Sequence, residues 1–322
     1  MRVGLFTDSL RDRPLEQAVR ESAELGVTDI ELGTGNWSPA PHVNLDRLLA
    51  DEGARTELLD LVVRHGVTLT ALNASGNILH PVTGVEHRRV LDDTIRLAGL
   101  LGVPTVVAMS GLPAAPGDRY PNWVTTAWPP ENHEILAHQW DIAIPAWTEV
   151  AALAADSGVH TVALELHPHQ LVYNPRSFRR LRDAVGERIS INLDPSHLMW
   201  LGADPIAVIA SLTDVPGAIG HVHAKDTQIL RDAQINTTLE TTPFEQVADR
   251  SWNYITLGSG HPEGARYWAR FVAALHSAGY DGMLSIEHED EARPRLDGVA
   301  ESVRILSEAI EASDLIHEKE SS

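Results

Sequence analysis

Eight short apolar runs alternate with longer amphipathic segments, and this alternation constrains the fold more than any other feature of the sequence. Short apolar runs are typical of buried parallel strands, and the segments between them have the period of amphipathic helices. Glycine closes several helical segments, as at Gly26, Gly102 and Gly158, where it favours a helix C-terminus. We expect strands at residues 3–7, 29–33, 68–73, 105–109, 161–167, 190–194, 218–225 and 284–288. The clearest helices are expected at residues 15–25, 45–65, 86–101, 135–157 and 265–278.

The absence of an interrupting linker predicts an α/β fold: a single (β/α)8 TIM barrel over residues 1–316, with a polar C-terminal tail over residues 317–322. Such barrels have about 250 residues, so the chain has room for insertions. Two long loops provide it, residues 112–132 after the fourth strand and the polar, irregular residues 227–261 after the seventh. Both are expected at the carboxyl face, as walls or lids of an active site. The alternative is a doubly wound nucleotide-binding sheet, but its Gly-x-Gly-x-x-Gly turn is absent after the first strand.

The formal net charge of −20 argues against a nucleic-acid partner, because phosphate binding requires a basic surface. The lack of cysteine excludes disulfides, thiolate metal sites and cysteine nucleophiles. No apolar run approaches the ~20 residues of a membrane helix, and the chain starts in a strand-like run rather than a signal segment. We therefore expect a cytoplasmic protein with no membrane partner that acts on a small molecule.

Polar side chains stand at the ends of four consecutive expected strands: Glu165, Asp194, His223 and Glu287. In a barrel these strand ends meet around one part of the mouth, where catalytic residues lie. Three carboxylates and one imidazole suit a divalent ion such as Mn²⁺ or Mg²⁺, with Co²⁺, Fe²⁺ or Zn²⁺ as alternatives. Any one of these residues alone could be a solvated or salt-bridged loop residue. Four of them at matching positions favour a metal site.

Two histidines follow the candidate ligands closely. His197 lies three residues after Asp194, so it could be a fifth ligand or could contact a substrate hydroxyl, while Asp194 caps a helix start. His167 lies two residues after Glu165 and would face the same way on a continuing strand. An imidazole beside a polarised carbonyl can accept a proton, so His167 is a candidate base. A surface histidine is the alternative.

Three further residues are candidate substrate contacts. Lys225 is one of only two lysines in the chain, and it could hold a carbonyl or anionic oxygen or pair with Asp226 or Glu287. Asn77 follows the third strand and could bind a sugar hydroxyl. Trp123, in the long loop after the fourth strand, could stack on a sugar ring or an aromatic aglycone, or could pack the loop itself.

The motifs around the four candidate ligands resemble those of the xylose-isomerase-like sugar phosphate isomerase/epimerase barrels. They are Ala-Leu-Glu-Leu-His-Pro at 163–168, Asp-Pro-Ser-His at 194–197, His-Val-His-Ala-Lys-Asp at 221–226 and Ser-Ile-Glu-His-Glu at 285–289. The resemblance implies that Glu165, Asp194, His223 and Glu287 bind a divalent metal, often Mn²⁺. It also implies that the two glutamates can act as the acid and base of an epimerase, with His197 near the substrate.

Residues 120–131 and 250–254 resemble a narrower group, the α subunits of bacterial C-glycoside deglycosidases. Those proteins cleave 3-oxo-glycosides together with a small β subunit, and a histidine matching His167 is thought to act as their base. The resemblance implies a small β subunit and a hetero-oligomer here. The chain departs from ketose epimerases after His223, because they carry an arginine shortly afterwards and the nearest one here is Arg231.

Together these features predict a metal-dependent enzyme that removes a proton next to the carbonyl of a sugar or an oxidised sugar. From a 3-oxo-glycoside, the resulting enolate expels the aglycone by β-elimination. From a ketose, reprotonation gives an isomer or epimer. A non-catalytic sugar-binding subunit is a third alternative.

Overall fold

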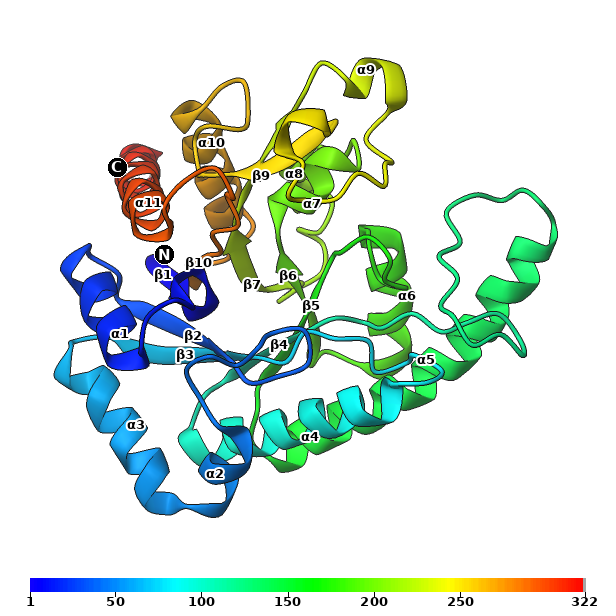
Figure 1. The fold of residues 1–322 in the computed structure, drawn as a ribbon, viewed down its shortest axis with the longest axis horizontal. Coiled ribbons are helices and arrows are strands. Elements are labelled where there is room, and N and C mark those ends of the chain that lie inside the picture. The colour runs from blue at the N-terminus through cyan, green and yellow to red at the C-terminus, as the bar shows by residue number, and fades with distance from the viewer. Residues whose placement is uncertain (321–322) are drawn as a thin grey trace.

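Eight parallel strands close into one barrel, in the order β1–β10–β7–β6–β5–β4–β3–β2, in the computed structural model of residues 1–320 (Figure 1). For residues 315–320 only the backbone is described. Each predicted strand is present, so the single TIM barrel is confirmed. The barrel strands are β1 (Arg2–Phe6), β2 (Asp29–Gly33), β3 (Thr68–Asn73), β4 (Thr105–Ala108), β5 (Thr161–Glu165), β6 (Ile189–Leu193), β7 (Ile219–Ala224) and β10 (Met283–Ile286).

Helices follow the barrel strands, as predicted, except that the single helix expected at residues 45–65 is two helices, α2 (Leu45–Ala50) and α3 (Glu52–Arg64). The break occurs at Asp51, which is extended and accepts a hydrogen bond from the Ala54 N–H at 3.2 Å, so that it caps α3. The other helices are α1 (Leu15–Glu24), α4 (Gly84–Leu101), α5 (Glu131–Asp156), α6 (Pro175–Val185), α7 (Pro195–Trp200), α8 (Pro205–Ala210), α9 (Ala233–Asn236), α10 (Ala265–Ser277) and α11 (Arg295–Glu320), with 3-10 turns η1 (Thr7–Leu10) and η2 (Val247–Asp249).

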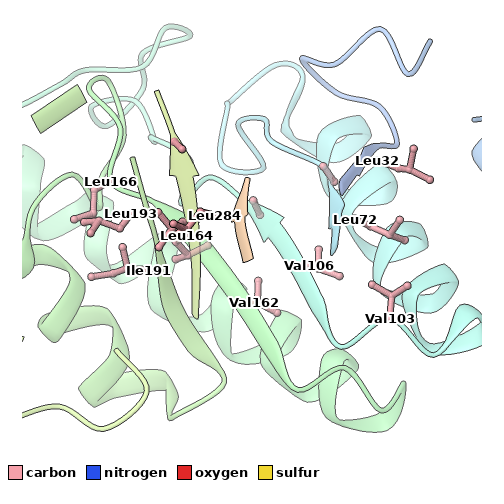
Figure 2. Close-up of a cluster of buried hydrophobic side chains, with 14 of the residues drawn as sticks. Leu32, Leu72, Val103, Val106, Val162, Leu164, Leu166, Ile191, Leu193 and Leu284 are labelled. Atoms are coloured by element: carbon pink, nitrogen blue, oxygen red, sulfur yellow. The ribbon is translucent and has the colours of Figure 1, made fainter. Parts of the chain in front are cut away.

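Side chains alternate along the barrel strands, so that apolar residues meet the helices and other residues fill the barrel. Figure 2 shows members of the outer apolar set, among them Leu164 and Leu284, which belong to the main core cluster. Inside the barrel, a small separate cluster contains Val107 and Met283. Gly4 makes room for it, since a Cβ there would lie 2.2 Å from Met283 Sδ. An apolar floor therefore lies inside the barrel, away from the polar strand ends.

The long segment after the seventh barrel strand was expected to be irregular. It instead contains an antiparallel hairpin of β8 (Asp226–Ile229) and β9 (Trp252–Ile255). Asp226 fixes its base, because its carboxylate accepts hydrogen bonds from the backbone of Gly258 and from the Trp268 indole on α10. Figure 1 shows α9, between the two strands, and the long loop before α5 extending away from the barrel. Both insertions follow strand ends, as predicted.

The backbone of α11 continues to Glu320. Residues 317–320 of the expected polar tail are therefore helical, whereas residues 321–322 lie outside the described residues. Within the described part of the chain, none of the helices has the length and apolar character needed to cross a membrane.

Candidate active site

A cavity of about 660 Å³ opens at the carboxyl ends of the barrel strands. One wall carries Glu165 and Glu287, from the ends of β5 and β10. An aromatic wall comes from the long segment after β7 and includes Phe244, Trp252 and Tyr254. The cavity thus joins an acidic cluster to an aromatic surface, and its volume is in the range of pockets for ligands of drug size.

The four predicted metal ligands converge beside this cavity, and two of them, Glu165 and Glu287, line it. His223 Nδ1 lies 3.4 Å from Glu165 Oε2 and 3.2 Å from Glu287 Oε2. Ligand atoms of Glu165, Asp194 and His223 all lie within 4.8 Å of one another. His223 Nδ1 and Asp194 Oδ2 are buried and make no hydrogen bond of normal geometry, although Lys225 Nζ lies 3.0 Å from Asp194 Oδ2. Such buried polar atoms are unusual unless an ion or water completes the site. The oxygen-rich donor set fits a divalent metal.

Asp194 has the capping role that the sequence suggested, and its other carboxylate oxygen faces the acidic cluster. Its Oδ1 accepts a hydrogen bond from the Ser196 N–H at 2.8 Å, which caps α7. Pro195 occupies the first helical position, where its missing N–H is tolerated. Capping uses only one carboxylate oxygen, and Oδ2 remains available to the cluster.

His197 connects the acidic cluster to the hairpin. Its Nε2 lies 2.7 Å from Glu165 Oε1 and 3.2 Å from Asp194 Oδ2, and its Nδ1 lies 3.0 Å from the Tyr254 hydroxyl. An ionised carboxylate only accepts, so Nε2 carries a proton, and Nδ1 shares a hydrogen bond with the Tyr254 hydroxyl. Burial raises the pKa of Tyr254 well above its ordinary value, so its hydroxyl remains a donor.

Lys225 lies within the same cluster and pairs with Glu287, one of the two partners that the sequence suggested. Its Nζ is 3.0 Å from Asp194 Oδ2 and 3.1 Å from Glu289 Oε2, and it also donates to Glu287. Burial lowers the pKa of Lys225, but these carboxylates outweigh burial and raise the pKa well above its ordinary value. The other suggested partner, Asp226, instead accepts bonds from the loop after β9.

His167 reaches the cavity from a turn rather than from the strand expected over residues 161–167. β5 ends at Glu165, and the His167 N–H donates to the Glu165 carbonyl at 2.9 Å. Its Nδ1 donates to the Pro168 carbonyl, which can only accept, so Nε2 of the neutral ring has a free lone pair. Burial and the His197 ring, 4.2 Å away, lower the pKa of His167 to about 3.

Asn77 and Trp123 do not line this cavity. Asn77 Oδ1 accepts from the Leu112 N–H at 2.9 Å and Asn77 Nδ2 donates to the Leu112 carbonyl, so its amide joins the loops after β3 and β4. Trp123 packs on His169 at 4.8 Å and on Tyr173 at 5.4 Å. Direct contact of these two residues with a substrate stays a prediction.

Glu31 is the main residue of the site that sequence reasoning missed. It is fully buried on β2, and its carboxylate accepts from His221 Nε2 at 2.8 Å and lies 3.2 Å from His223 Nε2. Ser285 also donates to it. Burial would raise the pKa of Glu31, but the two imidazoles outweigh burial and lower it well below its ordinary value. Its charge keeps a proton on His223 Nε2, as carboxylates do behind metal-binding histidines.

Comparison with known proteins places the chain in a family. Residues 19–309 match the family described as the xylose isomerase-like TIM barrel. The uncharacterized protein YfiH of Bacillus subtilis (strain 168) is 44% identical over 316 residues, which span 96% of this chain and 99% of that protein.

Solved structures of low sequence identity share the fold. The structure of L-ribulose 3-epimerase is 18% identical, with a TM-score of 0.65, and the match covers 100% of this chain and 98% of that one. The structure of a D-tagatose 3-epimerase-like protein is 20% identical, with a TM-score of 0.66 and 98% of each chain covered. The IOLI protein, whose structure holds a zinc atom, is 17% identical with a TM-score of 0.66, covering 96% of this chain and 98% of that one. The chain therefore belongs to the xylose isomerase-like TIM barrel family.

Proposed function

We propose that this protein is a divalent-metal-dependent enzyme that removes a proton next to a sugar carbonyl. Its proposed reaction is the elimination of the aglycone from a 3-oxo-glycoside, such as a 3-oxo-C-glycoside. One observation carries this proposal. Asp194 Oδ2 and His223 Nδ1 are buried, make no hydrogen bond of normal geometry and lie beside Glu165 and Glu287, which line the same cavity as the His167 imidazole.

Glu165, Asp194, His223 and Glu287 would hold the metal ion. A bound divalent ion supplies positive charge that polarises a carbonyl and stabilises the negative charge developing on its oxygen. The donor set contains oxygens and one imidazole nitrogen, so Mn²⁺ is our first expectation and Mg²⁺, Co²⁺, Fe²⁺ or Zn²⁺ are the alternatives. Glu31 would position His223 by holding its Nε2 proton, which leaves Nδ1 to face the cluster.

His167 is the proposed base. Its lowered pKa, about 3, keeps the imidazole neutral at physiological pH, so its lone pair is available. A weak base suffices only for an acidified C–H bond, such as one next to a polarised carbonyl. The same low pKa makes the protonated ring a strong acid, which can return the proton to a carbon leaving group.

The elimination balances without an added reactant. The C2–H bond of the 3-oxo sugar breaks, the proton moves to His167, and the electron pair forms an enolate with its charge on the oxygen at C3. The enolate collapses to a C1=C2 double bond as the bond from C1 to the aglycone breaks. His167 then donates the proton to the departing aglycone, so the products are an unsaturated keto sugar and the free aglycone.

Isomerisation or epimerisation of a ketose is the second candidate reaction. Glu165 and Glu287 both lie within 3.4 Å of His223 Nδ1, so two carboxylates are available there as an acid and a base. The large aromatic wall favours elimination, because a free ketose has no second ring to place there. A non-catalytic sugar-binding subunit is a third alternative, and it would leave every sugar unchanged.

The test is incubation with Mn²⁺ and 3-oxo-glucosides that carry C-linked or O-linked aglycones, in parallel with free ketoses. Mass spectrometry and NMR identify the products. Aglycone release that is lost in Glu165→Gln and His167→Ala supports the proposal. A new hexose without aglycone release supports the isomerase. Unchanged turnover in both variants excludes the assigned catalytic residues.

We further propose a small β subunit, on the resemblance of residues 120–131 and 250–254 to deglycosidase α subunits. Affinity purification of the tagged chain from its native source should then recover a small protein that increases aglycone release. Full activity of the isolated chain would contradict this partner.

A further inference from the structure

A second group of potential metal ligands lies beside the four proposed ones. It consists of Glu165, His167 and His197, each of which offers a ligand atom within 4.8 Å of the other two. His197 Nε2 is 2.7 Å from Glu165 Oε1, and the centres of the two imidazole rings are 4.2 Å apart. All three residues line the cavity, so an ion from solvent can reach them. We call them the histidine cluster.

Glu165 presents a different oxygen to each group of ligands. Its Oε2 lies 3.4 Å from His223 Nδ1, on the side of the proposed Mn²⁺ site, whereas its Oε1 faces His197. A carboxylate has lone pairs on both oxygens, so one glutamate can hold one ion with each. Two-metal sites place their ions about 3.5–4 Å apart. An ion in the histidine cluster therefore does not have to displace the ion held by the four proposed ligands.

The other nitrogen of each imidazole in the cluster has a partner that fixes the ring. His167 Nδ1 donates to the Pro168 carbonyl, which leaves the Nε2 lone pair free. His197 Nδ1 lies 3.0 Å from the Tyr254 hydroxyl oxygen. When His197 Nε2 binds an ion in place of its proton, Nδ1–H can donate to that oxygen. Metal-binding histidines usually have such a partner at the second nitrogen, so both rings are oriented for ligation.

The two groups of ligands differ in their chemistry. The four proposed Mn²⁺ ligands are three carboxylates and one imidazole, whereas the histidine cluster has one carboxylate and two imidazoles. Two histidines and a glutamate are a recurrent ligand set for zinc, with bonds of about 2.0–2.2 Å and a fourth position left open. Tetrahedral ligand atoms at such bond lengths are about 3.4 Å apart, so small side-chain movements would bring the three atoms onto one zinc ion.

The charge around the two groups favours a second cation. Four carboxylates lie within 3.4 Å of His223 or Lys225: those of Glu31, Glu165, Asp194 and Glu287. One divalent ion and the Lys225 ammonium group supply fewer positive charges than these carboxylates supply negative ones. A second divalent cation would therefore enter a region of net negative charge, which attracts it.

We propose that Glu165, His167 and His197 bind a second divalent cation, zinc, and that zinc bound there inhibits the enzyme. The bond to zinc uses the Nε2 lone pair of His167, so this imidazole can no longer accept a proton from the substrate. The binding site stands on the geometry of the three residues, whereas the inhibition rests on the proposed function.

Zinc stoichiometry tests the site without turnover. Metal-free protein is titrated with Zn²⁺ in competition with a chromophoric chelator. The wild type should bind one zinc ion more per chain than His167→Ala or His197→Gln, because each variant lacks one of the three ligands. Glutamine at 197 keeps an N–H donor for Glu165, so this variant tests the site even if His167→Ala folds poorly.

His169→Asn is the matched control for zinc binding. His169 is an exposed histidine of the same His-Pro-His segment and lies outside the cluster. Asparagine tolerates its positive φ of 58°. This variant should bind as much zinc as the wild type. Equal stoichiometry in the wild type, His167→Ala and His197→Gln would overturn the site.

Inhibition is measured as aglycone release from a 3-oxo-C-glucoside by the Mn²⁺-loaded protein at increasing Zn²⁺ concentration. The half-inhibiting concentration should be the same in the wild type and His169→Asn, and at least about tenfold higher in His197→Gln. Exchange of zinc for Mn²⁺ at the four proposed ligands would inhibit all three proteins at the same concentration. That result would overturn inhibition through the histidine cluster.

The two measurements separate this inference from the proposed function. If no 3-oxo-glycoside reacts but His167→Ala and His197→Gln bind one zinc ion fewer than the wild type, the site stands and the proposed reaction fails. If 3-oxo-glycosides react and zinc stoichiometry is the same in all the proteins, the reaction stands and the zinc site is wrong.

Discussion

Replacement of Lys225 by methionine should destabilise the metal-free protein much more than the metal-loaded protein. Lys225 Nζ lies 3.0 Å from Asp194 Oδ2, and the two side chains are only 4% and 0% exposed. Removing one partner of such a buried ion pair costs about 3–5 kcal/mol, because the other charge stays buried without compensation. The pair with Glu289 adds at most about 1 kcal/mol, because the Glu289 side chain is half exposed and screened by water.

Added metal should change this result. A divalent ion held by Asp194 and Glu287 would supply the positive charge that the variant lacks. We therefore expect Lys225→Met to lower the free energy of unfolding by about 3–5 kcal/mol in a chelator and by much less in excess Mn²⁺.

Urea unfolding followed by tryptophan fluorescence measures both values. Arg182→Met is the matched control, because the buried Arg182 guanidinium donates to the backbone carbonyls of Ile189 and Pro216 and contacts none of the proposed metal ligands. Its loss of stability should be the same with and without Mn²⁺. An equal loss in Lys225→Met under the two conditions would refute the reasoning, as would a negligible loss in the chelator.

Two further predictions concern acidic residues. Glu31→Gln should weaken Mn²⁺ binding by about 10- to 100-fold in a competition assay with a fluorescent chelator, because the variant no longer fixes the His223 proton. The control is Asp29→Asn, on the same strand and paired with Arg2, which should leave the Mn²⁺ affinity unchanged. If Glu31→Gln also left the affinity unchanged, Glu31 would not position His223. Burial raises the pKa of Asp8 from 3.8 to about 6, so its ionisation destabilises the fold as pH rises through that interval. Asp8→Asn should therefore raise the free energy of unfolding by up to about 3 kcal/mol above pH 7 and by nothing below pH 4, and a pH-independent difference would contradict the assignment.

The sequence was sufficient to predict the barrel and the convergence of the four candidate metal ligands, because both depend on local patterns. Each strand and the helix that follows it produce a recognisable alternation, and closure of the barrel brings the ends of successive strands together. Glu165, Asp194, His223 and Glu287 could therefore be assigned to one site although up to 122 residues separate them, from 165 to 287.

Features that depend on contacts across the barrel were not predictable. Glu31 lies on β2, 190 residues away from His221 in the sequence, so nothing local indicated their pairing. The hairpin of β8 and β9 joins segments separated by the long loop that contains α9, and its strands are only four residues each. The apolar pattern of residues 45–65 continues through Asp51 and so predicted one helix. The helix breaks there because the Asp51 side chain accepts a hydrogen bond from the Ala54 N–H and caps α3.

Loss of deuterium from a 3-oxo-glycoside labelled at C2 tests the central claim most directly. The reaction is followed by NMR in the presence of Mn²⁺, for the wild type and for His167→Ala. We predict that the wild type breaks the C2–D bond and releases the aglycone, and that His167→Ala does neither at a comparable rate. Release of the aglycone with the deuterium still at C2, or an unchanged rate of deuterium loss in His167→Ala, would contradict proton removal by this base.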